Sequence, residues 1–154
     1  MGSGGDSIPI KITTTRALEF HNKKRADHGC PDLKINNDLN NLAQKYAENM
    51  PKKQIPKIPL YAGVFLGENK YIYKGKMFDV EDMCYAWYNE IKSYDQNSNE
   101  YKKNTSHFTQ MIWKSSTDVG FGFYKKGNFY YTVALYYPPG NTLGEYKENV
   151  LFKN

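Results

Sequence analysis

The sequence predicts an α+β domain in which helices cover an antiparallel sheet. Three segments with apolar residues at helical spacing come first, and two alternating segments joined by a turn follow near the end of the chain. The 154 residues contain no internal repeat or linker, so we expect one domain over residues 8–154. Residues 1–7 are glycine- and serine-rich and are expected to be an expression tag or scar.

The first two predicted helices have clear end signals, and helical spacing is clearer in the second. The first helix is predicted over residues 12–28, since Gly29 and Pro31 end it. The second follows the capping candidates Asn36, Asn37 and Asp38 and stops at Pro51. Its buried stripe consists of Leu39, Leu42, Ala43, Tyr46, Ala47 and Met50.

The third helix is predicted to begin behind Asp79 and to continue to Tyr94. Its apolar stripe consists of Val80, Met83, Cys84, Trp87, Ile91 and Tyr94. Trp87 is therefore expected in the core. Glu90 lies about 80° from the axis of this stripe, at about 100° per residue, so it should emerge at the edge of the buried face.

The remaining segments are predicted to be loops and strands. Three prolines make residues 51–59 a loop, and residues 61–73 contain a short extended piece. Residues 107–113 are rich in β-forming side chains and are predicted to form a strand. Residues 119–124 and 129–137 alternate in polarity around the turn Lys126-Gly127-Asn128 and predict a hairpin.

The charge pattern favours a solvated surface. The net charge is +5 and the pI is about 9.0, but the lysines are dispersed from Lys11 to Lys153, so no nucleic-acid partner is expected. The doublets 102–103 and 125–126 would suit peripheral contact with a membrane. No segment approaches the roughly 20 apolar residues that span a bilayer, which predicts a soluble domain.

Two cysteines allow at most one disulfide. Cys84 lies on the apolar stripe of the third helix, which favours two buried free thiols over a bridge to Cys30. The sequon at Asn104 is compatible with a secreted protein, although such triplets also arise by chance.

Histidines supply the candidate chemistry. His21 lies on the first helix and is expected to make fixed structural hydrogen bonds, whereas His28 is expected at the end of that helix, where its dipole favours a cation. His107 follows a polar loop, which is where sites are commonly built. The sequence contains no phosphate-binding glycine loop, nucleophile elbow or paired-cysteine metal motif.

Several ordered segments resemble the CAP superfamily of cysteine-rich secretory, antigen 5 and pathogenesis-related type 1 proteins. The matching segments, in chain order, are Leu18-Glu-Phe-His21-Asn22-Lys-Lys-Arg25, Leu39-Asn-Asn-Leu-Ala43-Gln44-Lys-Tyr46-Ala47, Gly67-Glu68-Asn69, Trp87-Tyr88-Asn-Glu90-Ile91, His107-Phe-Thr-Gln-Met-Ile-Trp113 and Tyr137-Pro138-Pro139-Gly140-Asn141. Residues 148–151 resemble the Golgi-associated branch. Together the segments cover nearly the whole chain, in order.

The resemblance implies a three-layer α-β-α sandwich with a large central cleft. In the family, two histidines and two glutamates meet in that cleft, and in several members they hold zinc. The matching residues are Glu68, Glu90 and His107, but residues 51–66, where the other histidine would stand, contain none. The incomplete set predicts at most a weak site for a divalent metal such as zinc, and no required cofactor.

Hydrolysis is the less favoured interpretation of these residues. His107 would be the base and Glu90 would orient it, but Thr105 and Ser106 merely precede the histidine in sequence, which places no nucleophile. The favoured alternative is a hydrogen-bonded network that shapes the cleft without chemistry.

The resemblance therefore implies a secreted, non-enzymatic protein that binds lipids, sterols or protein partners. It also implies a role in modulating a host's immune response, as is thought of secreted parasite relatives. Tyr94 and Tyr101 are the candidate side chains for an apolar ligand with a polar end. The alternative is a cytoplasmic, membrane-associated protein of the Golgi branch, which the scarcity of cysteines favours.

Overall fold

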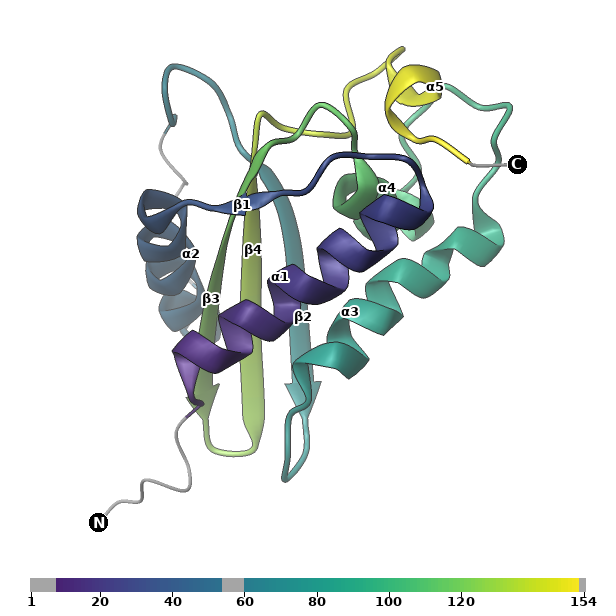
Figure 1. Cartoon of the computed structure of the whole chain (residues 1–154). Helices are drawn as coiled ribbons and strands as arrows, with labels where there is room; N and C mark the ends of the chain where they lie inside the picture. The colour runs from purple at the N-terminus through teal and green to yellow at the C-terminus, as the bar shows by residue number, and fades with distance from the viewer. Residues whose placement is uncertain (1–7, 54–59, 153–154) are drawn as a thin grey trace.

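The computed structural model describes residues 8–53 and 60–152 and forms three layers (Figure 1). The predicted tag at residues 1–7 lies outside these residues, as does most of the proline-containing loop. The helices are α1 (Ile10–Asp27), α2 (Asn37–Asn49), α3 (Val80–Tyr88), α4 (Ser106–Ile112) and α5 (Tyr146–Asn149), with 3-10 turns η2 (Met50–Lys52), η3 (Asn89–Ser93) and η4 (Lys103–Thr105). The strands are β1 (Lys34–Ile35), β2 (Gly67–Lys74), β3 (Asp118–Lys126) and β4 (Phe129–Tyr137).

The sheet has the order β1-β3-β4-β2. The predicted hairpin is confirmed, because β3 pairs with β4 in antiparallel register from Asp118–Tyr137 to Lys126–Phe129. Strand β2 adds to β4, also antiparallel. Strand β1 was not predicted, since two residues show no period, and it pairs with β3 in parallel. The sheet is therefore antiparallel with one short parallel edge.

Helix α2 packs on one face of the sheet at very close range. A Cβ atom at Gly120 or Gly122 would lie 2.2–2.3 Å from backbone atoms of α2, so glycine is what allows the helix to approach β3. Asn40 and Gln44 of α2 accept hydrogen bonds from the backbone N–H groups of Phe121 and Phe123, both at 2.9 Å. These side chains satisfy donors of β3 beyond the end of the short β1.

The opposite face of the sheet is covered by α1, α3 and α4, which together with it enclose the larger core (Figure 1). Trp87 is 3% exposed in this core, as predicted. Both cysteines are buried and free, which also confirms the prediction. None of the helices in the described residues is long and apolar enough to cross a membrane.

The predicted helices are confirmed with small shifts in their ends. Asn36 caps α2 through its side-chain oxygen, which accepts from the N–H groups of Asp38 and Leu39. Asp79 caps α3 in the same way. The third helix is α-helical only to Tyr88 and then tightens into η3 up to Ser93.

One element was predicted wrongly. Residues 107–113 belong to α4 and its C-cap rather than to a strand. Residues 108–112 are all buried, so neither the helical nor the strand period is visible in their polarity. β-branched and aromatic side chains carry only a weak preference, which tertiary contacts override. Here the deciding contact is a carboxylate from the preceding helical segment, described below.

Candidate functional site

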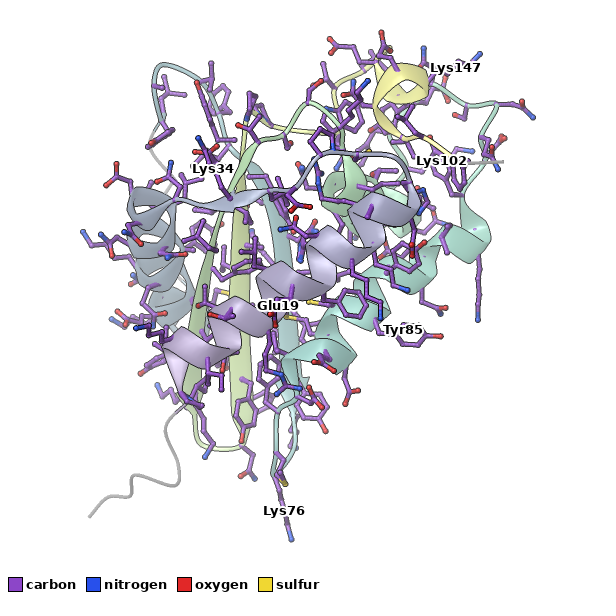
Figure 2. All side chains as sticks on the ribbon, in the orientation of Figure 1. Glu19, Lys34, Lys76, Tyr85, Lys102 and Lys147 are labelled. Carbon is purple, nitrogen blue, oxygen red and sulfur yellow. The ribbon has the colours of Figure 1, made fainter. Side chains whose placement is uncertain are left out.

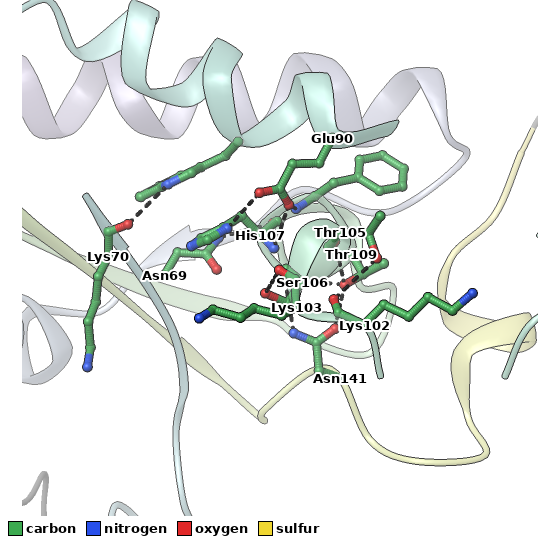
Figure 3. A network of polar contacts seen from close by, with 12 residues as sticks. Asn69, Lys70, Glu90, Lys102, Lys103, Thr105, Ser106, His107, Thr109 and Asn141 are labelled. Atoms are coloured by element: carbon green, nitrogen blue, oxygen red, sulfur yellow. Dashed lines mark hydrogen bonds and ion pairs between the residues drawn. The ribbon is translucent and has the colours of Figure 1, made fainter. Parts of the chain in front are cut away.

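The candidate site is built on the first turn of α4, where His107 meets Glu90 (Figure 3). Glu90 Oε2 accepts from His107 Nδ1 at 2.8 Å. The other carboxylate oxygen, Oε1, accepts from the backbone N–H groups of His107 at 2.9 Å and Phe108 at 3.1 Å. The side chains of His107 and Glu90 are 32% and 21% exposed, respectively, so the pair lies at the surface. Glu90 thus emerges at the edge of the buried face, as predicted.

The carboxylate of Glu90 acts as the cap of α4. The first N–H groups of a helix have no partner within the helix, and a negative charge there also favours the helix dipole. Thr105, the N-cap residue, contributes no side-chain cap. Glu90 reaches α4 from η3 and supplies this cap instead.

His107 is oriented by two further contacts. Its ring stacks on Trp87 with the centroids 5.9 Å apart and the planes 5° from parallel. Since Nδ1 donates to Glu90, Nε2 is the ring nitrogen that remains for a ligand. Trp87 in turn donates from Nε1 to the backbone carbonyl of Lys70 at 3.3 Å, which fixes the indole against β2.

A buried chain of hydrogen bonds connects the site to α1. Asn69 Nδ2 donates to the His107 carbonyl at 3.1 Å and to the Tyr136 hydroxyl at 3.2 Å. The Tyr136 hydroxyl bonds His21 Nε2 at 2.7 Å, and His21 Nδ1 bonds the Ala17 carbonyl at 2.8 Å. The carbonyl requires Nδ1–H, so Nε2 is the acceptor. Burial lowers the pKa of His21 to about 4, which keeps it neutral. His21 is structural, as predicted.

His28 also has fixed partners. It forms the C-cap of α1, as expected for a residue at that helix end. One ring nitrogen bonds the Leu151 carbonyl at 2.6 Å and the other the Tyr88 hydroxyl at 2.7 Å. These contacts tie the C-terminal segment to α1 and α3.

Arg25 holds the other end of α4. Its guanidinium is fully buried and donates to five backbone carbonyls: Pro31, Met111, Trp113, Lys114 and Ser116. A cation near the last carbonyls of a helix is favoured by the helix dipole. The short helix that carries His107 is therefore held at its N-terminal end by an anion and at its C-terminal end by a cation.

Gln110 fixes α4 sideways against two glycines. Its Oε1 accepts from the Gly140 N–H at 2.8 Å, and its Nε2 donates to the Ser116 hydroxyl at 3.2 Å. A Cβ at Gly67 would lie 2.0 Å from the Gln110 side chain, so glycine is required beside it. Nearby, Asn141 Nδ2 donates to the Ser106 carbonyl at 3.0 Å (Figure 3).

Glu68 lies apart from the other two predicted residues. Successive side chains of a strand point to opposite faces, and Asn69 of β2 points towards α4. Glu68 therefore points with Lys70 towards the α2 face, where the two side chains are 3.4 Å apart and Lys70 also bonds Tyr46 at 2.9 Å. The described residues contain no group of three or more His, Cys, Asp or Glu side chains that could hold a metal ion.

The hydroxyl groups that precede His107 point into the backbone. Ser106 Oγ donates to the Lys103 carbonyl at 3.1 Å, and Thr105 Oγ1 donates to the Lys102 carbonyl at 3.3 Å (Figure 3). A nucleophilic hydroxyl has to lie within hydrogen-bond reach of its base. These two hydroxyls hold η4 instead.

The two candidate ligand tyrosines differ in their surroundings. Tyr94 stacks on Phe152 with centroids 5.9 Å apart and meets Phe108 edge-on, so it packs against the core. Tyr101 is exposed. A pocket of about 280 Å³ lies elsewhere, between the start of α1 and the connection from β2 to α3, and neither tyrosine lines it. The central cleft and the ligand role of these residues stay predictions.

Sequence reasoning missed Asn69 and Arg25. Asn69 was noted only as part of a motif, yet the alternation of β2 already places it on the face opposite to Glu68. Arg25 lies four residues after His21 and eight after Ala17, which is one buried face of α1. That spacing was the available signal, although nothing in it shows which carbonyls the guanidinium meets.

The family profile of cysteine-rich secretory proteins, named CAP, matches residues 18–137. This match runs from the middle of α1 to the end of β4 and includes Glu68, Glu90 and His107. The chain belongs to the CAP family. The α-β-α sandwich described above is the fold of the solved CAP structures that it matches.

Two individual relatives, one human and one from yeast, are similar to this chain over most of its length. This CAP domain is 37% identical over 142 residues to human Golgi-associated plant pathogenesis-related protein 1, across 87% of this chain and 89% of that protein. It is 33% identical over 141 residues to PRY2 of Saccharomyces cerevisiae, across 90% of this chain but only 41% of the yeast protein. The chain thus spans less than half of PRY2.

Solved structures confirm the fold. A structure of NaASP2 with Zn²⁺ matches with a TM-score of 0.70 at 20% identity, over 99% of this chain and 90% of that one. Venom allergen-like protein 4 of Schistosoma mansoni matches with a TM-score of 0.67 at 24% identity, over 94% and 96% of the two chains.

The described residues of this CAP domain do not fit a zinc centre. Both oxygens of Glu90 are engaged by His107 and by the backbone of α4. Glu68 faces the other side of the sheet, and residues 51–66, where the resemblance implies a second histidine, contain none. A zinc site needs three or four ligands that converge, so we assign no metal to this site.

Proposed function

We propose that this CAP domain is a non-enzymatic binding protein and that the surface around His107 is part of its binding site. The proposed partners are lipids, sterols or proteins. Nε2 of His107 supplies one polar group to such a partner, and the imidazole, about a third exposed, is held in place by its stacking on the buried Trp87.

The observation that supports binding rather than hydrolysis is the engagement of the catalytic-looking groups. Glu90 makes three hydrogen bonds that stabilise α4, and the neighbouring hydroxyls of Thr105 and Ser106 donate to backbone carbonyls. Neither hydroxyl is therefore positioned as a nucleophile for His107.

The test combines binding and activity measurements on the same preparation. Titration with a radiolabelled sterol and a radiolabelled fatty acid should give saturable binding of at least one of them, or a pull-down with a defined receptor ectodomain should show a protein partner. Ester and peptide substrates should be turned over no faster by the wild type than by the His107→Ala variant. Hydrolysis that is lost in His107→Ala would overturn the proposal.

A second candidate is a membrane-associated protein of the Golgi-associated type. It is favoured by the 37% identity to the human protein across most of both chains, and by two buried free thiols. The first candidate is favoured by the secreted fungal relatives, among them one named secreted protein PRY1 of Candida albicans. Asn104 is exposed in η4, so its sequon is accessible.

Expression of the full natural gene in eukaryotic cells separates the two locations. A secreted protein should appear in the medium and should lose mass on treatment with an N-glycosidase, and Asn104→Gln should abolish that change. A cytoplasmic, membrane-associated protein should stay in the cells, unglycosylated, and should sediment with membranes.

A further inference from the structure

The end of the molecule opposite to Lys102 and Lys147 carries exposed apolar side chains among lysines (Figure 2). We call residues 74–78 and 125–129 the lysine tip. These ten residues contain four lysines and no acidic residue. We propose that the lysine tip docks on the surface of a membrane that contains anionic phospholipids.

The lysine tip is one continuous piece of structure. It joins the end of β2 to the turn between β3 and β4, and the Gly75 N–H donates to the Asn128 carbonyl at 2.9 Å. The Tyr130 hydroxyl donates to the Lys76 carbonyl, also at 2.9 Å. These two contacts hold the segments side by side, so their side chains present one surface.

Apolar side chains protrude from the lysine tip. Met77 is 82% exposed and Phe129 is 39% exposed. Ile12 of α1 is exposed as well, and it lines the same pocket as Met77. Large apolar side chains that face water in a group mark an interaction surface. This group is small compared with the roughly 800 Å² per partner of a stable protein interface, so it suits insertion between lipid headgroups better than a protein contact.

The charges of the lysine tip complement an anionic surface. Lys74, Lys76 and Lys126 are exposed and form no ion pair with a carboxylate of the described residues. The nearest acidic residues in sequence include Asp79 and Glu81, which both pair with Arg16. Lysine stems can lie along the apolar side chains while the ammonium groups meet phosphate, and Lys74 already lies 5.6 Å from the Phe129 ring.

The opposite end of the molecule offers a control with the same residue types. Lys102 and Lys103 are exposed there. Tyr101, which precedes Lys102 in the sequence, and Leu143 are exposed apolar side chains. Acidic residues accompany these lysines, however. Asp95 and Glu100 precede them in the sequence, and Glu145 and Glu148 belong to the segment that Asn99 binds through Gly144 and Tyr146. An anionic surface would be attracted to the first end and only weakly to the second.

Sedimentation with vesicles tests the proposal on the full chain. Wild-type protein should bind vesicles of phosphatidylcholine and phosphatidylserine and should not bind phosphatidylcholine alone. Each lysine near an anionic surface changes the partition coefficient about fivefold, so Lys76→Ala/Lys126→Ala should lower it roughly 25-fold. Lys102→Ala/Lys103→Ala removes the same charge and should change it far less. Met77→Ser should lower it about tenfold.

All four substituted lysines and Met77 are exposed, so circular dichroism and the thermal midpoint should match the wild type. An equal loss in the two double variants would overturn the proposal, as would wild-type binding that ignores phosphatidylserine. Self-association of the wild type without vesicle binding would also overturn it, in favour of a contact between two copies. The lysine tip deepens the membrane-associated candidate, whose location in cells is tested separately by the expression experiment above. None of these outcomes bears on the His107 site.

Discussion

Replacing Arg25 with lysine keeps the buried charge but removes at least two of its five hydrogen bonds. The guanidinium donates through all three nitrogens to five carbonyls, at distances between 2.8 and 3.4 Å. A lysine ammonium has three donors on one atom, so at least two carbonyls lose their partner. Each buried acceptor left unpaired costs about 1–2 kcal/mol. The free energy of unfolding should therefore fall by about 2–4 kcal/mol.

The assay is urea unfolding followed by tryptophan fluorescence, because Trp113 is buried and its carbonyl is one of the five acceptors. The thermal midpoint should fall by about 5–15 °C for a domain of this size. Arg16→Lys is the matched control on the same helix. Arg16 is exposed and pairs with Asp79 and Glu81, so its substitution should leave both midpoints within error.

An unchanged unfolding midpoint in Arg25→Lys would refute the reasoning. It would mean that the carbonyls at the end of α4 do not depend on the guanidinium. An equal loss in Arg16→Lys would refute it differently, since the effect would then come from the arginine stem rather than from buried hydrogen bonds.

Three further predictions concern other buried groups. The pKa of His21 is about 4 in the folded protein and about 6.5 in an unfolded chain, so the unfolded chain binds the proton at a higher pH. The free energy of unfolding should therefore fall by about 3 kcal/mol as the pH falls from 6.5 to 4. His21→Gln should remove this part of the pH dependence of urea unfolding. Burial raises the pKa of both Cys30 and Cys84, so a thiol reagent should label neither in buffer and both in urea; rapid labelling of the native protein would contradict this. Gly122→Ala should destabilise the fold by about 1–3 kcal/mol in the same unfolding assay, because the new Cβ would lie 2.3 Å from the backbone of Ala43; an unchanged midpoint would contradict it.

Local periodicity predicted the elements whose polarity differs between faces. Helix α2 has one face on the core and one largely exposed, so its spacing appears directly in the sequence. The β3–β4 hairpin is buried on both faces at residues 119–123 and 132–136, and its β-forming side chains and the turn Lys126-Gly127-Asn128 predicted it instead. Helix α4 could not be predicted in this way. Residues 108–112 are buried all round, and the contact that caps the helix comes from Glu90, in a segment well before it in the sequence.

The candidate site was predicted only in part for a related reason. The resemblance pointed to His107 and Glu90, and the structure brings them together. It also pointed to Glu68, whose direction depends on the pleat of β2 rather than on its place in a motif. The partners of Arg25 are backbone carbonyls, which every residue possesses, so no sequence pattern could single them out.

The way α4 is held explains why metal binding and stability would compete in this chain. Glu90 accepts two hydrogen bonds from the first turn of α4 and one from His107, while Arg25 binds the carbonyls at the other end. A metal that took Glu90 as a ligand would draw its carboxylate from the helix. Each charged hydrogen bond given up would cost about 1.5–3 kcal/mol. Glu68 lies on the far face of the sheet, residues 51–66 contain no histidine, and His21 and His28 have fixed partners, so the remaining ligands could not offset that loss. In this CAP domain the pair of Glu90 and His107 therefore serves to position α4 and to present Nε2 at the surface.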